Sequence, residues 1–558
     1  MKTLQNLGLV ALAAVAMSFG WWLSSGLPML AGFVPLLILA SRHDASRRSW
    51  WRMAGYVMLF FALWYGMTVW WVWLATPAGP IAAVFLAWIY TGLPLMAWFW
   101  ISKRAPKALS YTFLVSAWTV GEWIYNTNQL SFPWLNIGNG FAHDPWAVQW
   151  YEWTGVYGGT VWVLVSSILI YEFLAIRPFR VKNLFAPALA VIVPLAVSLA
   201  LYFTYDEPTR TARVTVVQPN VDAWAQNEIS PEEKTAGLVE LISEAPSDTR
   251  FIVMPEAAVN ESLIEGRLAS SPSLAALKGA VAASAPEATI VAGATTYRLY
   301  GSTKATDTAH GDVETGYSDH FNSALAVSPD GTVAIHHKAK LVPGAEMTPS
   351  WWWARKLLFL IDGLDFYVGQ YGYGTARTVF DNESAAVAVA VPDAVAPGTG
   401  SSAATGTVRA GAGICWESVY GEYMSEFVRG GAELLFIITN DGWWDDTPGH
   451  RQHFDLARLR AIETRRSVAR SANTGRSGFI SPRGDVLGGD LVMGDTSATD
   501  GTLEWNERGV ITADLPIDRR ITFFVRFGDW PVRVSMLVLG LSILYFVAWR
   551  IRRKHLIS

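Results

Sequence analysis

The chain of 558 residues contains a single cysteine, Cys415, and few charged residues. One thiol can neither form an internal disulfide nor build a zinc site by itself, so a disulfide-stabilised scaffold is excluded. Charged residues make up 16% of the chain, compared with about 25% in average soluble proteins. The net charge of −4 gives no indication of nucleic-acid binding. Hydrophobic residues make up 51% of the sequence, which is typical of a membrane protein.

The hydrophobic residues are concentrated in residues 1–204 and 531–549, whereas the middle of the chain has the composition of a soluble domain. A helix needs about 20 apolar residues to cross a bilayer. We therefore predict eight transmembrane helices, at 5–24, 27–41, 54–75, 80–101, 108–126, 153–175, 184–204 and 530–549. The first of them also has features of a signal peptide, but the apolar segment that follows at once favours an uncleaved helix.

Lysine and arginine residues in the loops predict the orientation of these helices. They occur at Lys2 and in the stretches 41–52, 102–107, 177–182 and 550–554. The alternate loops, 76–80 and 126–146, contain neither residue. With eight spans, every basic stretch falls on one side, and the positive-inside rule places that side in the cytoplasm.

This orientation divides the chain into three parts. We expect a membrane domain of seven helices over residues 1–204, an external domain over 205–529, and a last transmembrane helix with a cytoplasmic tail over 530–558. Both termini are then cytoplasmic. In a bacterium, such a protein spans the inner membrane and its soluble domain lies in the periplasm.

The expected external domain has an α/β pattern. Val- and Ile-rich runs predict strands at 213–218, 250–255, 288–294, 322–328, 333–338, 410–415 and 433–440. Helical patterns cover 272–284 and 452–472. The Ala-, Gly- and Ser-rich stretch 382–407 indicates a loose insertion.

Three polar residues stand at the ends of predicted strands in this domain. Glu256 follows "FIVMP", Lys338 closes "VAIHHK" and Cys415 closes "AGAGIC". Each has a plain structural alternative: a charge at a helix start, a solvated rim residue and a small buried hydrophobe. These alternatives leave the shared position unexplained, because functional groups of α/β sheets gather at the carboxyl ends of strands.

The three residue types have complementary chemistry. A thiol with a pKa near about 8.5 is mostly protonated at neutral pH, and only the thiolate attacks carbonyl carbons well. A carboxylate can remove the proton as a general base. An ammonium group stabilises the thiolate and then the oxyanion of a tetrahedral intermediate. Glu, Lys and Cys are therefore sufficient for acyl transfer through a thioester.

Sequence motifs around these residues resemble those of a known family. They are "VVQPN" (216–220), "HKAKLVPGAE" (337–346), "GICWE" (413–417), "TNDGWW" (439–444) and "RAIETRRSVARSANTG" (460–475), with "GEW" (121–123) and "FPWLNIG" (132–138) in the apolar part. In this order they resemble the nitrilase (carbon–nitrogen hydrolase) superfamily. Within it they are similar to the apolipoprotein N-acyltransferases, its integral membrane members. The resemblance spans nearly the whole chain.

The resemblance implies a four-layer αββα sandwich for the external domain and a Glu-Lys-Cys catalytic set. Glu256 then corresponds to the general base, Lys338 to the cation beside the oxyanion, and Cys415 to the nucleophile. Glu346 and Glu417 match two further acidic positions near the nucleophile.

Two departures from the family pattern concern the acyl pocket. Trp416 stands where a tyrosine is common, and "PGAE" stands where many members have "PFGE". Trp416 and, with it, Trp443 in "TNDGWW" are expected from the resemblance to support substrate binding. Trp224 is the nearest candidate for the tryptophan that follows the first strand in the family.

The reaction implied by the resemblance moves a fatty acyl chain from a phospholipid to the α-amine of the N-terminal S-diacylglyceryl cysteine of apolipoproteins. It implies a membrane-embedded protein that needs no cofactor or metal. The sequence does not determine the oligomeric state, for which a monomer is expected. "HRQH" (450–453), which lacks a third ligand, is expected on the surface. The aromatic and apolar stretch 349–374 is expected to rest on lipid, or else to be a core helix of the sandwich.

Two other functions fit parts of the pattern. A membrane-anchored amidase of the nitrilase type would use the same three residues, although eight spans exceed what an anchor needs. A non-catalytic scaffold that handles lipoproteins would keep the fold, but it would not need all three reactive residue types.

Overall fold

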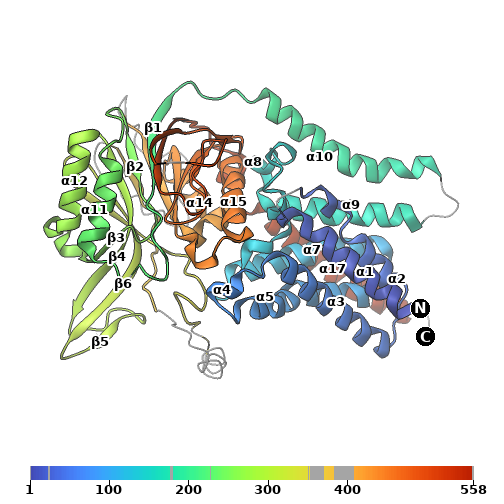
Figure 1. Cartoon of the computed structure of the whole chain (residues 1–558). Coiled ribbons are helices and arrows are strands. Elements are labelled where there is room, and N and C mark those ends of the chain that lie inside the picture. Colours follow the sequence, from blue (N-terminus) through green and yellow to red (C-terminus); the bar gives the residue numbers. More distant parts are fainter. Residues whose placement is uncertain are drawn as a thin grey trace. The chain divides into compact units, whose positions relative to one another are not determined.

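The computed structural model describes residues 2–22, 25–175, 180–226, 228–349, 351, 370–382, 407–494 and 496–555. They form two compact units, one from Met1–Thr204 with Phe527–Ser558 and the other from Tyr205–Arg526 (Figure 1). Most of the predicted lipid-resting stretch 349–374 and of the predicted insertion 382–407 lies outside the described residues.

The first unit is helical. Its helices are α1 (Lys2–Ser18), α2 (Val34–Ser41), α3 (Arg47–Thr68), α4 (Val72–Ala75), α5 (Gly79–Ala87), α6 (Leu93–Ser102), α7 (Lys107–Thr127), α8 (Tyr151–Thr154), α9 (Val156–Ala175), α10 (Phe185–Thr204) and α17 (Trp530–His555). A π-helical turn, Trp88–Gly92, joins α5 to α6. Helix α3 begins earlier than expected because the Ser46 hydroxyl caps it, accepting a hydrogen bond from the Ser49 N–H at 3.2 Å.

Within the described residues, five helical segments are long and apolar enough to cross a membrane: Lys2–Trp21, Gly79–Ser102, Val156–Ala175, Val181–Thr204 and Trp530–Arg553. The other three predicted spans also contain helices. Leu27–Ser41 is short, whereas α3 begins with several arginines and α7 contains serine, threonine and glutamate. The number of eight spans is thus supported for five segments and stays a prediction for the remaining three.

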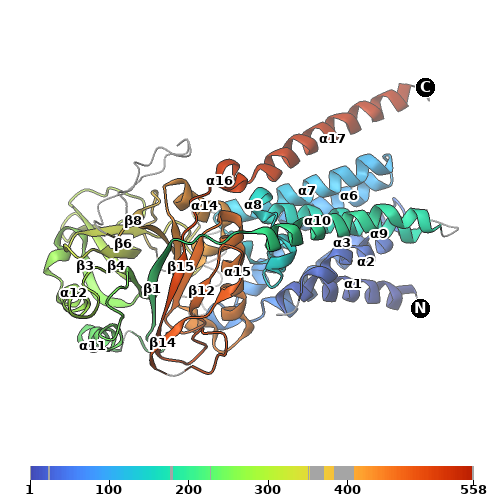
Figure 2. The ribbon, with the colours of Figure 1, turned by 90° about the horizontal axis from the view of Figure 1, so that it is seen from above.

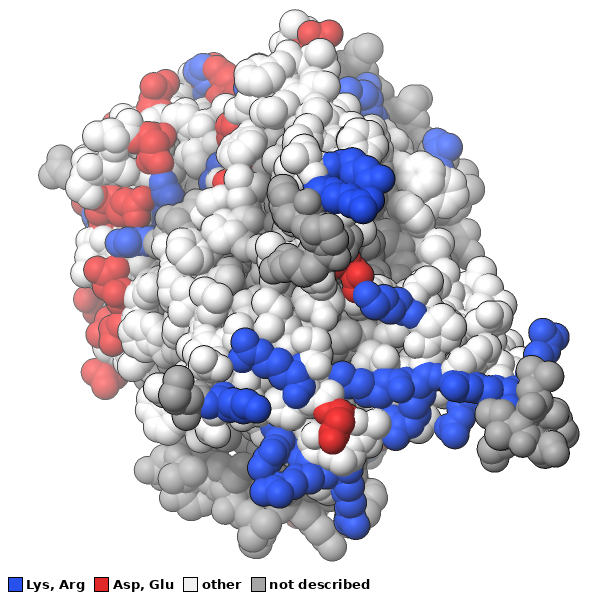
Figure 3. All heavy atoms as spheres, turned by 90° about the vertical axis from the view of Figure 1, so that its right-hand side faces the viewer, with Lys and Arg blue, Asp and Glu red and all other residues white. Residues whose placement is uncertain are grey.

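Basic residues gather at one end of the helical unit. Both chain ends lie there in two perpendicular views (Figures 1 and 2). Figure 3 looks onto this end and shows the Lys and Arg side chains gathered on it. The basic residues of these loops and helix ends are Lys2, Arg42, Arg47, Arg48, Arg52, Lys103, Arg104, Lys107, Arg180, Lys182, Arg550, Arg552 and Arg553.

A buried carboxylate organises the loop between α7 and α8. Glu122 on α7 is 4% exposed. It accepts hydrogen bonds from the Ile137 N–H at 3.0 Å and the Thr160 hydroxyl at 2.7 Å. Gly138 approaches α9 so closely that a Cβ on it would lie 1.9 Å from the Val156 carbonyl oxygen. These contacts explain why "GEW" and "FPWLNIG" stand in an otherwise apolar part of the sequence.

The second unit contains two sheets. The strands of the first are β1 (Thr211–Gln218), β2 (Phe251–Val253), β3 (Val259–Ile264), β4 (Thr289–Gly301), β5 (His310–Asp312), β6 (Gly316–Val327), β7 (Val333–His337), β14 (Asp490–Gly494) and β15 (Gly509–Pro516). Their order is β14-β15-β1-β2-β4-β6-β5, with β3 paired to β4 and β7 to β6.

The second sheet has the order β13-β12-β11-β10-β9-β8. Its strands are β8 (Val379–Asp381), β9 (Arg409–Ile414), β10 (Leu434–Thr439), β11 (Ser467–Ala472), β12 (Gly478–Ile480) and β13 (Val486–Leu487). Strands β9, β10 and β11 are parallel, and so are β1, β2 and β4.

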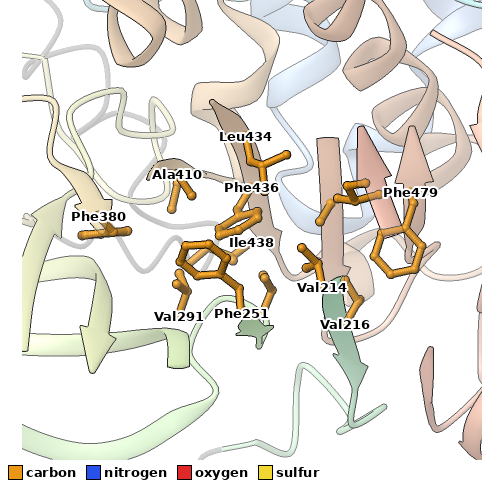
Figure 4. Packing of buried hydrophobic residues seen from close by; sticks show 14 of the residues in the cluster. Val214, Val216, Phe251, Val291, Phe380, Ala410, Leu434, Phe436, Ile438 and Phe479 are labelled. Carbon is orange, nitrogen blue, oxygen red and sulfur yellow. The ribbon is translucent and has the colours of Figure 1, made fainter. Parts of the chain in front are cut away.

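Successive side chains along a strand point to opposite faces of its sheet, and this alternation creates two hydrophobic layers. In β2, Phe251 and Val253 belong to the core between the sheets, whereas Ile252 belongs to the outer core of the first sheet. Figure 4 shows Phe251 and Phe436 among the side chains that fill the space between the two sheets.

Helices cover the outer faces. Helices α11 (Pro231–Ile242) and α12 (Pro272–Ser284) pack on the first sheet. Helices α14 (Gly421–Arg429) and α15 (Pro448–Thr464) contact the second. The unit is therefore an αββα sandwich, as the resemblance implied, and it ends at the short helix α16 (Phe523–Phe527).

The predicted helix 452–472 is wrong in its second half. Helix α15 ends at Thr464, Arg465 takes a left-handed conformation with φ of 51°, and residues Ser467–Ala472 form the buried strand β11. The helical pattern is overridden because β11 pairs in parallel with β10 inside the second sheet.

Candidate active site

Glu256, Lys338 and Cys415 all follow strands and meet in the sandwich unit. Lys338 comes directly after β7, Cys415 directly after β9, and Glu256 shortly after β2. The Lys338 Nζ lies 3.1 Å from Glu256 Oε1. Lys338 is 1% exposed and Cys415 is 8% exposed. The structure therefore brings these three residues together at a nearly closed site.

The backbone is strained beside two of these residues. Cys415 has a φ of 48°, and Ala257, next to Glu256, has a φ of 53°. Non-glycine residues seldom adopt positive φ, and such strain clusters at functional sites. Gly293 on β4 makes room for the Glu256 turn, since a Cβ there would lie 2.5 Å from the Glu256 Cα.

The Lys338 ammonium is shared by two carboxylates. Its second partner is Glu346 Oε1, at 2.8 Å. The Asn322 side-chain amide donates to the same oxygens, at 2.7 Å to Glu256 and 2.9 Å to Glu346. Burial on its own would lower the pKa of Lys338, but the two carboxylates outweigh it and hold that pKa well above its usual value. Lys338 is therefore a permanent cation.

Each carboxylate is also fixed by a backbone N–H. Glu256 Oε2 accepts from the Asn440 N–H at 3.1 Å, and Glu346 Oε2 accepts from the Val342 N–H at 2.8 Å. With these bonds, each carboxylate oxygen of Glu256 and Glu346 has a hydrogen-bond donor beside it. Glu256 is thereby held in a single position beside Lys338.

The thiol of Cys415 is protonated at neutral pH. Burial raises its pKa, the negative charge of Glu256 raises it further, and Lys338 and the Thr439 hydroxyl only partly oppose the shift. Because only a thiolate is a strong nucleophile, the thiol needs a base at the moment of attack. Glu256 is the carboxylate whose charge acts most strongly on this thiol.

Glu417 holds the nucleophile turn to the segment that follows Lys338. It accepts hydrogen bonds from the N–H groups of Ile414 at 2.9 Å and Ala339 at 2.6 Å. His336 and the Tyr423 hydroxyl also contact it. Burial favours its neutral form, but these partners outweigh burial and lower the pKa of Glu417 to about 2. Its side chain is fully buried, and its contacts fix the turn that carries Cys415; a direct role of Glu417 in catalysis or substrate binding stays a prediction.

The two predicted tryptophans lie in different surroundings. Trp416 is 5% exposed, and its indole N–H donates to the Tyr420 hydroxyl at 3.0 Å. Trp443 is half-buried. Its ring meets that of Trp224 edge-on, with ring centroids 5.0 Å apart. Trp224 is 59% exposed, so this aromatic pair is on the surface of the sandwich.

A buried polar network beneath Cys415 was not predicted from the sequence. The Cys415 carbonyl accepts from the Ser418 hydroxyl at 2.7 Å and lies 3.3 Å from His453 Nε2. His453 Nδ1 lies 2.9 Å from Asp441 Oδ1, and Arg470 Nη2 donates to Asp441 Oδ2 at 2.6 Å. The network supports the strained backbone of the nucleophile from below.

The surface assignment of "HRQH" was wrong, because the side chains of His450 and His453 are fully buried. The charged residues around them gave the segment a surface pattern, and its burial depends on contacts that are distant in sequence. Among the described residues, no group of three or more His, Cys, Asp or Glu side chains is arranged to hold a metal.

Removing either charged neighbour of Cys415 is expected to move the pKa of its thiol, in opposite directions. Glu256→Gln lowers that pKa because a nearby negative charge is lost, and Lys338→Met raises it because a positive charge is lost. The rate of alkylation of this single thiol by iodoacetamide, measured from about pH 6 to 11, reports the thiolate fraction. The exposed Lys304→Met is the matched control. Shifts in the same direction would contradict the charge arrangement.

Glu417→Gln is expected to lower the thermal stability of the detergent-solubilised protein. A carboxyl whose pKa falls from 4.5 to about 2 on folding stabilises the fold by roughly 3 kcal/mol at neutral pH. This contribution is fully present above the unfolded-state pKa and is lost as the pH falls through the folded-state pKa. The Tm difference from wild type should therefore narrow below about pH 4.5. An equal difference at all pH values, or the same loss in the exposed Glu287→Gln, would contradict this account.

Two family models match the chain. The carbon-nitrogen hydrolase model matches residues 213–522, and the model of the apolipoprotein N-acyltransferase N-terminal domain matches residues 7–169. The apolipoprotein N-acyltransferase of Chlorobaculum tepidum is 28% identical, over 94% of this chain and 93% of its own length. That of Ralstonia nicotianae is 26% identical, over 98% and 92%.

A solved structure of an amidase of the nitrilase superfamily from Nesterenkonia is 13% identical, with a TM-score of 0.33, and covers 56% of this chain and 93% of its own. The carbon-nitrogen hydrolase model extends over more than half of the chain and includes Glu256, Lys338 and Cys415. The chain therefore belongs to the carbon-nitrogen hydrolase family.

Proposed function

We propose that this protein is an apolipoprotein N-acyltransferase. It transfers a fatty acyl chain from a phospholipid to the α-amine of the S-diacylglyceryl cysteine at the N-terminus of apolipoproteins. The observation that carries the proposal is the similarity, over more than nine-tenths of both chains, to a protein of that name. The second family model, over residues 7–169, supports the acyltransferase assignment because it covers the helical unit as well.

The first half-reaction acylates Cys415. Glu256 takes the thiol proton while the sulfur attacks the ester carbonyl carbon of the phospholipid. When Glu256 becomes neutral, Lys338 keeps its positive charge and only Glu346 still opposes it. The ammonium can then stabilise the oxyanion of the tetrahedral intermediate. The intermediate collapses, the glycerol oxygen leaves with the proton held by Glu256, and a lysophospholipid and a Cys415 thioester remain.

The second half-reaction transfers the chain. The α-amine of the diacylglyceryl cysteine attacks the thioester carbonyl carbon and gives a proton to Glu256. The carbon–sulfur bond breaks, an amide forms, and the Cys415 sulfur recovers its proton from Glu256. Both half-reactions use the same three groups, and no other reactant is required.

The helical unit fits substrates that reside in a bilayer. Both substrates carry acyl chains, and each methylene contributes about 0.8 kcal/mol to membrane binding. A soluble enzyme would have to extract them, whereas five segments of this chain are apolar enough to cross a membrane. We place the basic end of the helical unit in the cytoplasm, and with it both termini, so that residues 205–529 are periplasmic.

N-acylation of a peptide tests the proposed reaction directly. Purified protein, phospholipid and a diacylglyceryl-cysteine peptide should yield a peptide that gains one amide-linked acyl chain, measured by mass spectrometry. Cys415→Ala, Glu256→Gln and Lys338→Ala should reduce the rate by at least about 100-fold, because each removes a group that acts on the reacting atoms. The exposed Glu287→Gln and Lys304→Ala are matched controls. Release of free fatty acid with an unmodified peptide would indicate a hydrolase instead.

Reporter fusions test the proposed orientation. Alkaline phosphatase fused after residue 300 should be active, because it folds only outside the cytoplasm. A fluorescent protein fused to the C-terminus should fold and fluoresce in the cytoplasm. If the phosphatase fused after residue 300 is inactive and a fluorescent protein fused at the same place is fluorescent, residues 205–529 lie in the cytoplasm and the proposed orientation is wrong.

A further inference from the structure

A cavity of about 330 Å³ opens at the basic end of the helical unit. It lies between the start of α3 and the end of α6, in a part of the chain that the proposed reaction does not use. Three of its lining residues are cations (Arg47, Lys103 and Arg104), and three others are tryptophans (Trp50, Trp51 and Trp100). The cavity thus combines positive charge with amphipathic aromatic rings.

Two of the cations are held in place by carbonyl groups and aromatic rings. The Arg104 guanidinium lies 4.5 Å from the centre of the Trp100 ring and donates to the Trp100 carbonyl at 3.0 Å. The Lys103 ammonium lies 5.2 Å from the centre of the Phe99 ring and donates to the Ala40 carbonyl at 2.8 Å. Neutral carbonyls and rings orient both groups, while the charge of Asp44 partly offsets that of Lys103.

The balance of charge around the cavity is positive. Asp44 is the nearby acidic residue, and it accepts hydrogen bonds from Ser46 and Ser49. Arg550 on α17 adds a further cation, with its guanidinium 5.7 Å from the centre of the Trp100 ring. The described residues named around the cavity thus include one carboxylate, Asp44, and four cations, so the cavity attracts an anion.

The aromatic rings indicate an anion that carries an apolar part. Trp51 is 61% exposed, and Trp50 and Trp100 are partly exposed. Tryptophan favours the level at which lipid headgroups meet hydrocarbon, and basic pockets between helices on the cytoplasmic side suit acidic headgroups. A free phosphate would use the cations but leave the rings without a partner.

We infer that this cavity binds the headgroup of an anionic phospholipid. Its phosphate contacts Arg47, Lys103 and Arg104, and its glycerol and first methylenes pack on Trp51 and Trp100. The inference rests on the proposed orientation, which places the lipid in the cytoplasmic leaflet. The bound lipid fastens α3 to α6 and is not the acyl donor, because the proposed orientation places it in the cytoplasmic leaflet and Cys415 in the periplasm.

Native mass spectrometry of the full chain tests the inference. The mass spectrum of the wild-type protein should show one bound phosphatidylglycerol molecule, held in this cavity. In a thermal unfolding measurement, phosphatidylglycerol should raise the Tm of the protein more than phosphatidylcholine does. The variant with Arg47→Gln, Lys103→Gln and Arg104→Gln should bind phosphatidylglycerol at least about tenfold more weakly. The matched variant with Lys182→Gln, Arg552→Gln and Arg553→Gln removes equal charge from the same end and should bind as wild type does.

Additional variants and ligands distinguish this lipid site from a folding defect and from simple phosphate binding. Trp51→Ala changes an exposed side chain, so it should fold and still weaken lipid binding. An equal Tm rise with inorganic phosphate alone, or equal losses in both triple variants, would overturn the inference. The measurements are repeated in Cys415→Ala, where the lipid cannot be consumed. If Cys415→Ala binds the lipid but the wild-type protein does not acylate the peptide, the proposed reaction is refuted and the lipid site is not.

Discussion

The buried ammonium of Lys338 is the interaction on which the site depends. It separates the carboxylates of Glu256 and Glu346, which would otherwise repel each other in a medium of low polarity. Removing one partner of a buried ion pair leaves an uncompensated charge and costs roughly 3–5 kcal/mol. Asn322 donates to the same two carboxylates, so the ends of β2 and β7 are tied to the middle of β6. The position of the base is thus fixed by the same contacts that stabilise this region of the sandwich.

In the proposed mechanism, this arrangement keeps the Cys415 thiol protonated until a substrate enters. Burial and Glu256 together raise the pKa of the Cys415 thiol, so the sulfur carries its proton and reacts slowly with adventitious electrophiles. Its backbone is held at positive φ by contacts on both sides, with Glu417 at the turn and His453 beneath the carbonyl. The protein therefore maintains a strained, protonated nucleophile beside a fixed base.

Glu256, Lys338 and Cys415 were predictable as candidate site residues because each follows a buried strand whose pattern is local. Asn322 was not predictable, since it lies within β6 and gains its role only by facing two carboxylates on distant turns. His453 was read as a surface residue because neighbouring charges hid its burial, and Arg470 was assigned to a helix although it lies in the buried strand β11. In the helical unit, α3 and α7 contain polar residues that lower their hydropathy, and Glu122 takes one hydrogen bond from Trp118 on its own helix and two from distant segments. Motifs, caps and periodicity are local, whereas burial and pairing depend on the whole fold.

The fate of the isolated acyl-enzyme tests the proposed acyl transfer through Cys415 most directly. Protein that has been treated with phospholipid, freed of lipid and weighed intact should carry one acyl chain on Cys415, removable by hydroxylamine as a thioester is. The adduct should persist in buffer and disappear when a diacylglyceryl-cysteine peptide is added, with the same mass appearing on the peptide amine. An adduct that decays to free fatty acid at the same rate with and without the peptide would contradict the account.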